Sequence, residues 1–357
     1  MKGLSLNIRL LLIFGIFMIG FLVTHNKFIR KDSFTFYRSM NQAVELSQDW
    51  FNVIRKEKMD RGIISDVNSN VLNRFLIGDD FTLITTTLGS LAAKEVSTNP
   101  EFAALMVRLL RKAGLKPGDK AGLLVSGSFP ALAISTLAAI QTMELEAVVM
   151  SSLGASTYGA NQEEATWIDL ESWLINNADL KHTSLVISIG AENDRGEGLS
   201  EEGIEIMKKA VSRNSRELYQ PENLIESIQH KVEIFSSENI AVLINIGGNQ
   251  SALGGCTHAV ALPNGLHREL NLCNHPDRGV IQEMNANGIP VINLLNIKDL
   301  ASNYGIDLSP GLSYAKSTNL YIDQKPNKVA LIVTLLIGFL CMGVLFLNRK
   351  KDPMVNV

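Results

Sequence analysis

Five short, almost wholly apolar segments alternate with helical patterns through most of the chain, and this alternation limits the fold more than any other feature. The apolar segments cover residues 121–126, 146–152, 184–190, 241–248 and 290–296. Between them, apolar residues recur at helical spacing in 130–143, 167–175, 201–211, 221–236 and 278–287. Strands without a polar face are typical of parallel sheets that helices cover on both sides. The sequence therefore predicts a Rossmann-like α/β domain with a mostly parallel sheet of about five strands and helices on both faces.

Lipid-like apolar runs lie near both ends of the chain. The run at 329–347 has no charged residue, and at about 1.5 Å per residue it is long enough to cross the ~30 Å core of a bilayer. The run at 10–23 is shorter and follows Lys2 and Arg9. The small-residue pattern of a cleavage site does not follow it, so an uncleaved signal anchor is favoured over a cleaved signal peptide. We expect two transmembrane helices.

Two spans would put both termini on one side of a membrane and the central part on the other. The basic residues 349–351 indicate a cytoplasmic tail, whereas Lys27, Arg30 and Lys31 after the first run indicate the opposite. Long domains translocate largely regardless of their charge. We therefore expect a protein of the bacterial cytoplasmic membrane with an extracytoplasmic central domain.

The expected organisation has six parts. Residues 40–58 and a segment that starts near Thr98 and ends at Gly114 have the pattern of helices ahead of the first strand. The parts are a signal anchor (1–24), a helical and mixed N-terminal part (25–114), the Rossmann-like α/β domain (115–310), a linker (311–328), a transmembrane helix (329–347) and a basic tail (348–357).

Charge and motifs exclude several classes of ligand. The net charge is -3 and no basic patch is interleaved with aromatic residues, so nucleic acid is not an expected partner. The first strand end, SGSFPA, lacks the GxGxxG fingerprint of dinucleotide sites, and the chain has no GKS or GKT of a Walker loop. No cofactor is predicted.

Two cysteines fall in the central part, Cys256 and Cys273. In an oxidising compartment they would form a disulfide, and otherwise they are two unrelated thiols. His258, His267 and His275 lie nearby, which leaves a metal site or a Cys/His nucleophile open. Neither CxxC nor HxxxH spacing is present, so no metal site is predicted.

The predicted strands end in small and hydroxyl-bearing residues. Ligands of open α/β sheets bind outside the carboxyl ends of the strands, where the strand order reverses. The candidate binding residues at these ends are Ser126, Gly127, Ser128, Ser152, Ser156, Glu192, Asp194, Arg195, Gly247, Gly248, Asn249 and Ser251. Backbone N–H groups and serine hydroxyls suit a carboxylate or a phosphate. The alternative is that each glycine or serine only forms a tight turn.

The segment 190–200, GAENDRGEGLS, carries the groups with the most chemical scope. Glu192 or Asp194 would act as a general base, and Arg195 would clamp an anion. A solvated loop that closes its own salt bridge is the alternative. Ser126 and Ser128 are the candidate nucleophiles, although VSGSF does not match the GxSxG elbow.

Several unusual stretches resemble one family. They are ITTTLGSLAAKEVSTNPEFAALMVRLLRKAG, VSGSFPAL, SSLGAS with YGAN and TWIDLES, GAENDRGEGLS, and GIPVINLLNIKDLASNYGI. Together they resemble the bacterial poly-gamma-glutamate system protein family from about residue 84 to 306. The match is weaker at 62–80 and in GGNQSALGG. The resemblance implies a membrane-anchored accessory protein that acts with the ligase and export components for gamma-linked polyglutamate.

Three hypotheses follow. The leading one is a component that binds the polymer or its synthesis and export proteins through the crevice at the strand ends, because each unit of the polymer carries a free carboxylate. The second is a hydrolase or transferase that acts on the polymer. The third is a structural partner in which the crevice has no role.

Overall fold

A computed structural model describes residues 29–64, 71–255, 262–274, 278–309 and 313–326, together with Gly15, Gly311, Ile332, Gly338 and Phe339. These residues belong to two compact units. One unit is Phe36–Leu320, and the other combines Met1–Thr35 with Tyr321–Val357. In the second unit, β1 (Ile29–Ser33) pairs with β12 (Ile322–Pro326) in antiparallel register.

The two predicted membrane spans, 10–23 and 329–347, lie outside the described residues except for Gly15, Ile332, Gly338 and Phe339. Within the part of the chain that is described, no helix combines the length and the apolar character needed to cross a bilayer. Both spans therefore remain predictions.

The unit Phe36–Leu320 is a mixed α/β structure built on a six-stranded sheet in the order β10-β11-β9-β3-β4-β8. Five of its strands are parallel. They are β3 (Lys120–Ser126), β4 (Glu146–Ser152), β8 (Ser184–Ser188), β9 (Val242–Ile246) and β11 (Val291–Leu294), and they confirm the five predicted segments. The sixth, β10 (Gly265–His267), is an antiparallel edge strand too short to give a periodic signal. Numbered along the chain, the parallel strands have the order 3-2-1-4-5 of doubly wound sheets.

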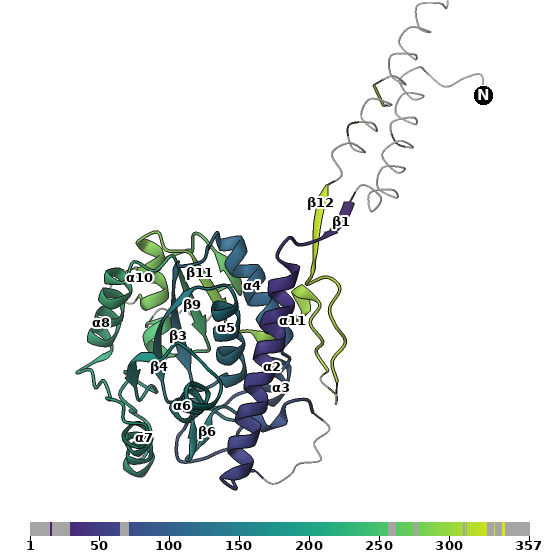
Figure 1. The fold of residues 1–357 in the computed structure, drawn as a ribbon. Helices are drawn as coiled ribbons and strands as arrows, with labels where there is room; N and C mark the ends of the chain where they lie inside the picture. Colours follow the sequence, from purple (N-terminus) through teal and green to yellow (C-terminus); the bar gives the residue numbers. More distant parts are fainter. Residues whose placement is uncertain are drawn as a thin grey trace, which may run out of the picture. The chain divides into compact units, whose positions relative to one another are not determined.

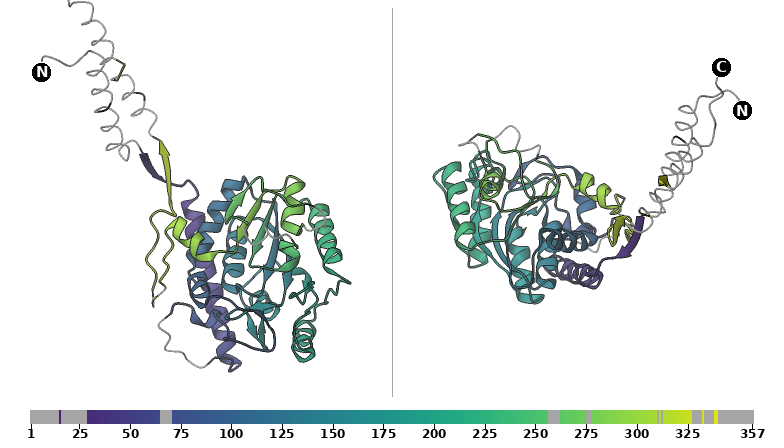
Figure 2. Two further views of the ribbon diagram at one scale, coloured as in Figure 1. Left: turned by 180° about the vertical axis from the view of Figure 1, so that it is seen from behind. Right: turned by 90° about the horizontal axis from the view of Figure 1, so that it is seen from above.

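Helices cover both faces of this sheet, as predicted, and Figure 1 shows α8 and α10 on one side with α2, α4 and α5 on the other. The view from behind in Figure 2 shows the same arrangement. Right-handed crossovers explain it, since the chain moves one way from β3 to β8 and then reverses to reach β9 and β11. The principal helices are α2 (Tyr37–Asp60), α4 (Glu101–Ala113), α5 (Pro130–Thr142), α6 (Trp167–Asn177), α7 (Glu201–Arg213), α8 (Leu224–Ser237) and α10 (Val280–Ala286), and they confirm the predicted helical segments.

The alanine-rich helix α5 is buried along nearly its whole length, from Pro130 to Ile140. It packs against α2 and α4, which lie over it as a further layer. A helix enclosed on all sides has to be apolar all round, and this accounts for the sequence PALAISTLAAI. On the opposite face, Leu124 and Met150 of the sheet pack with Phe235 of α8 and Met284 of α10.

Two small strand pairs were not predicted. β2 (Thr85–Thr87) runs parallel to β5 (Ala155–Ser156), and β6 (Asn161–Gln162) pairs with β7 (Ala165–Thr166). The first pair brings a hydroxyl-rich segment from the N-terminal part of the chain beside the loop that follows β4. The short helix α3 (Leu91–Ser97), which follows β2, is held near the carboxyl edge of the sheet in this way.

Candidate functional site

The strand order reverses between β3 and β9, and the candidate site lies at their carboxyl ends. A side chain added at Gly247, just after β9, would meet the Ser126 Cβ at 3.1 Å, so the two strand ends are in contact. A cavity of about 260 Å³ opens at this point. Hydroxyl and amide side chains dominate its lining, which consists of Thr86, Thr87, Ser126, Ser128, Ser152, Gly154, Ala191, Glu192, Gly248, Asn249 and Gln250.

Half of the residues proposed from the sequence therefore line one cavity. These are Ser126, Ser128, Ser152, Glu192, Gly248 and Asn249. The others, which lie outside this lining, are Gly127, Ser156, Asp194, Arg195, Gly247 and Ser251. Most of the second group support the first through the contacts described next.

The turn after β3 is a small network of serines. The Ser126 hydroxyl donates to Ser128 Oγ at 3.0 Å and accepts the N–H of Ser128 at 3.2 Å. Ser128 Oγ also accepts the N–H of Ser156 at 3.0 Å. Ser128 Oγ acts as an acceptor in these contacts and donates to no described residue, so its own proton is free for a ligand.

Gly127 is required in this turn for steric reasons. A Cβ at this position would lie 2.6 Å from the carbonyl oxygen of Leu153, which belongs to the backbone after β4. The Gly127 N–H donates to the carbonyl of Ser152 at 3.0 Å, which fixes the close approach of the two segments. Gly127 thus shapes the cavity without lining it.

Lys94 of α3 lies buried behind the same turn. Its ammonium donates to the carbonyl of Ser128 and, at 2.7 Å, to Ser156 Oγ. It also lies 3.9 Å from the centre of the Phe129 ring. Burial lowers the pKa of Lys94 to about 7, so the charge of this side chain changes near neutral pH.

A second network holds the opposite wall. The Asn249 amide donates to Ser152 Oγ at 2.8 Å, and its carbonyl oxygen accepts the N–H and hydroxyl of Ser251 at 2.8 and 2.7 Å. Lys231 donates to Ser251 Oγ at 2.7 Å and to Asp194 at 2.5 Å. This chain of contacts fixes which end of the Asn249 amide faces Ser152.

Asp194 is wholly buried in this network. Besides Lys231, its carboxylate accepts the hydroxyls of Ser188 at 2.9 Å and Ser227 at 2.6 Å. A carboxylate with three partners inside the protein is placed for structural support. The sequence suggested a general base at this position because Asp194 follows a strand end, but spacing alone does not reveal burial.

The loop 190–198 has unusual backbone geometry. Ala191, Asn193 and Asp194 adopt φ angles of 59°, 55° and 61°, a region that residues other than glycine rarely occupy. The Asn193 N–H donates to the Gln250 side chain at 2.5 Å, which ties the loop to the residues after β9. Backbone strain of this kind clusters at functional sites.

Three charged side chains of this loop remain exposed, Glu192, Arg195 and Glu197, and their surroundings differ. Arg195 donates to the carbonyl of Glu222, and its Nε lies 3.9 Å from Glu197, so the loop closes its own ion pair as the alternative interpretation held. Glu192 lines the cavity. Among the described residues, its carboxylate has no hydrogen bond or ion pair.

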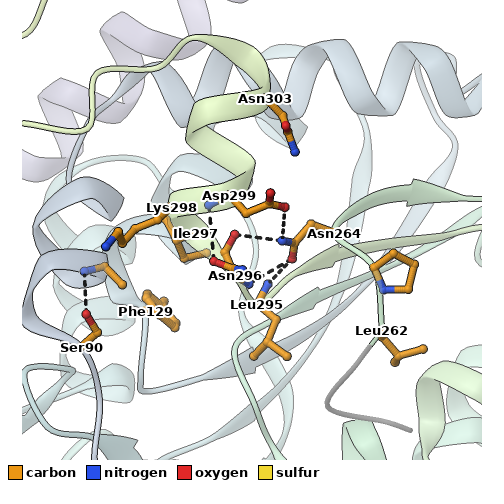
Figure 3. A pocket seen from close by; sticks show the side chains of 12 residues that line it. Ser90, Phe129, Leu262, Asn264, Leu295, Asn296, Ile297, Lys298, Asp299 and Asn303 are labelled. Atoms are coloured by element: carbon orange, nitrogen blue, oxygen red, sulfur yellow. Dashed lines mark hydrogen bonds between the residues drawn. The ribbon is translucent and has the colours of Figure 1, made fainter.

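A larger cavity of about 870 Å³ lies at the carboxyl end of β11, by the start of α11 (Ile297–Tyr304) (Figure 3). Asn264 organises its edge: its side chain accepts the N–H of Asn296 at 3.0 Å and donates to Asp299 at 3.0 Å. Ser90, Phe129, Leu295 and Lys298 are also among its lining residues. The two cavities adjoin, since Ser128 and Phe129 are consecutive and a side chain on Gly248 would meet Leu295 at 3.5 Å.

The cysteine and histidine cluster is described in part. Cys273 is disulfide-bonded. Its predicted partner Cys256 lies outside the described residues, as do His258 and His275. His267 of β10 has its Nε2 3.0 Å from the carbonyl oxygen of Asn264.

Lys94, Thr86, Thr87 and Gln250 were not proposed from the sequence. The run Thr85–Thr87 is a visible hydroxyl cluster, but its place in the site depends on the pairing of β2 with β5. Lys94 gives no sign of burial in the sequence, because a lysine on a short helix is normally solvated.

Comparisons with known proteins add little. The chain matches no family model and no curated protein sequence. A multiple substrate aminotransferase from Thermococcus profundus is similar at 10% identity and a TM-score of 0.20, over 72% of this chain and 50% of that one. A kynurenine aminotransferase from Pyrococcus horikoshii is similar at 13% identity and a TM-score of 0.19, over 70% and 48%. The chain spans about half the length of these two structures, and TM-scores this low do not define a shared fold.

Proposed function

We propose that this chain is a membrane-anchored accessory component of poly-gamma-glutamate synthesis or export, and that it binds carboxylate groups of the polymer in the cavity between β3 and β9. The observation that carries the proposal is the lining of that cavity, where serine and threonine hydroxyls and two amide side chains converge at the switch point of the sheet. Such groups bind carboxylates by hydrogen bonds, and this is where doubly wound sheets bind their ligands.

The polymer itself comes from the sequence resemblance, and the membrane anchorage comes from the apolar runs at 10–23 and 329–347. We place the central part of the chain outside the cytoplasm for the reasons of charge and length given above. The disulfide bond of Cys273 supports an extracytoplasmic location, because disulfides persist in oxidising compartments.

A linear ligand fits the arrangement of the two cavities. The small cavity accommodates one carboxylate-bearing unit, and the larger one, which adjoins it at Phe129 and Gly248, would take the units that follow. Lys298 lines the larger cavity and would meet a carboxylate there. Affinity should therefore rise with the number of linked units.

The test is a calorimetric titration of gamma-linked glutamate oligomers into the full-length chain in detergent. Ser128→Ala removes the free hydroxyl proton of the turn, and a hydrogen bond to a charged group contributes about 1.5 to 3 kcal/mol, or roughly ten- to a hundredfold in affinity. Ser212→Ala, which changes an exposed serine of α7, is the matched control. Equal affinity of wild type and a folded Ser128→Ala variant would contradict the proposal.

A second candidate function, a hydrolase or transferase acting on the polymer, is favoured by one contact. Lys94 Nζ lies 2.7 Å from Ser156 Oγ, and serine–lysine pairs are a known variant of nucleophilic catalysis. Ser156 is buried behind the cavity lining, so the turn would have to move for its Oγ to reach an amide carbonyl; neutral Lys94 would then accept the Ser156 proton and return it to the leaving nitrogen. Water or an amine would then release the acyl group from Ser156.

Incubation of the full-length chain with the polymer, followed by gel analysis of chain length, separates the two functions. An enzyme would shorten or rearrange the polymer, and Lys94→Met would abolish the change. If the chain length of the polymer is unchanged after a long incubation, the enzyme function is excluded and the binding function remains.

A further inference from the structure

We propose that the small cavity recognises the amino-terminal end of its ligand, with a free α-amino group on Glu192 and the adjacent α-carboxylate on the serine turn. The inference rests on the proposed function and specifies which part of the polymer enters the cavity.

The first observation is the position of Glu192 in the cavity. It is the one titratable side chain in the described lining, and the other ten positions carry hydroxyl, amide or small neutral groups. The neighbouring acids of the same loop are paired, Asp194 with Lys231 and Glu197 with Arg195. Glu192 is left to interact with whatever fills the cavity.

The second observation is the polarity of the two walls. The serine turn lines the same cavity as Glu192, and there Ser128 retains a free hydroxyl proton while Lys94 donates to the Ser128 carbonyl from behind. The turn presents hydroxyl donors to the cavity, whereas Glu192 presents negative charge. A ligand that carries only carboxylates would be repelled by Glu192, whereas a ligand with an ammonium and a carboxylate on one carbon satisfies both walls.

Only one unit of a gamma-linked chain carries both a free ammonium and a free carboxylate on the same carbon. In every internal unit the α-amino nitrogen is part of an amide, and only the α-carboxylate is free. The amino-terminal unit alone has a free α-ammonium beside a free α-carboxylate. The cavity volume of about 260 Å³ lies below the range of about 300–1,000 Å³ usual for small-molecule sites, which suits a single terminal unit with the chain continuing toward the larger cavity.

The test crosses two ligands with two proteins. A gamma-linked glutamate tetramer and its N-acetylated form are titrated into full-length wild type and into Glu192→Gln, with circular dichroism as the folding control. Wild type should bind the free tetramer about ten- to a hundredfold more tightly than the acetylated one, the range of one charge-assisted hydrogen bond. In Glu192→Gln the ratio should fall close to one. Glu202→Gln, which removes an exposed carboxylate of α7, should keep the wild-type ratio.

The outcomes separate this inference from the function on which it rests. Equal binding of both tetramers to wild type would overturn recognition of the amino end and leave the binding function standing. A wild-type ratio that persists in Glu192→Gln would overturn the role of Glu192. No binding of either tetramer would overturn both. If Glu192→Gln does not fold, the comparison of the two tetramers on wild type alone decides the inference.

Discussion

Lys94 and Asp194 are both buried charged residues near the cavity, but their surroundings differ. Asp194 has a full ion pair with Lys231 and two hydroxyl donors. Among the described residues, the partners of Lys94 are neutral: the Ser128 carbonyl, the Ser156 hydroxyl and the Phe129 ring. A buried charge without a counter-charge has a shifted pKa, whereas a paired one costs stability only when its partner is removed. Substitutions of the two residues should therefore affect the stability of the protein in different ways.

Replacement of Asp194 by Asn should destabilise the protein by about 3 to 5 kcal/mol, because it leaves the Lys231 ammonium buried and unpaired. Urea unfolding of wild type and variant measures the difference. Glu197→Gln, which removes an exposed carboxylate of the same loop, is the control and should change stability by less than about 1 kcal/mol. A similarly small effect of Asp194→Asn would show that the pair is open to solvent.

Lys94 predicts a dependence of stability on pH. Its folded pKa is about 7, below the 10.5 of an ordinary lysine. Between these values the unfolded chain binds more protons than the folded one, so the contribution of Lys94 to stability rises with pH across this window. As the pH rises through this window, the unfolding free energy of wild type minus that of Lys94→Met should increase by up to about 1.4 kcal/mol per pH unit.

Urea unfolding at pH 7.5 and pH 9 provides the measurement for Lys94→Met. Lys112→Met, at an exposed position of α4, should follow the wild-type profile. Parallel profiles for wild type and Lys94→Met would mean that the Lys94 ammonium is solvated.

The turn between β3 and α5 shapes the site, and its one glycine, Gly127, differs from Gly248, which follows β9. A Cβ on Gly127 would approach the Leu153 carbonyl to 2.6 Å, a backbone atom that cannot turn aside. A Cβ on Gly248, which lines the cavity, would meet Leu295 Cδ1 at 3.5 Å and Leu253 Cδ1 at 3.9 Å, both ordinary contacts. The same substitution therefore has different consequences at two positions of one site.

Gly127→Ala should destabilise the protein by about 1 to 3 kcal/mol, the usual cost of forcing extra atoms into a packed site, and should weaken ligand binding. Gly248→Ala should fold with stability close to that of wild type. Thermal unfolding of both variants by circular dichroism makes the comparison. Equal melting temperatures for Gly127→Ala and wild type would show that the β4 loop yields to the added methyl group.

At the scale of helices and strands, much of the fold could be predicted from the sequence. Long apolar strands such as β3 and β4 and strongly periodic helices such as α2 leave a clear pattern. The pairing of β2 with β5 left none, because strands of two or three residues have no period and their partners are set by tertiary packing. The serines at the strand ends were found because parallel strands bring their ends together, whereas Lys94 depends on that unpredicted pairing.

For the whole molecule, the open question is the side of the membrane on which the unit Phe36–Leu320 lies. Protease added to spheroplasts should digest this unit if it is extracytoplasmic, while an epitope placed after the basic residues 349–351 should stay protected. Immunoblots of intact and permeabilised spheroplasts give the readout. Protection of the central unit in intact spheroplasts would contradict the proposed topology.

The pairing of β1 with β12 bears on how the chain is made. The ribosome releases β1 before the unit Phe36–Leu320, and its partner β12 emerges only after that unit has been translated. Until then the backbone groups of β1 are an open strand edge, and such edges are prone to pair with the wrong chain. Translation of β12 is therefore the event that allows this strand pair to close, and a truncated chain that lacks Ile322–Pro326 would leave β1 permanently exposed to misassembly.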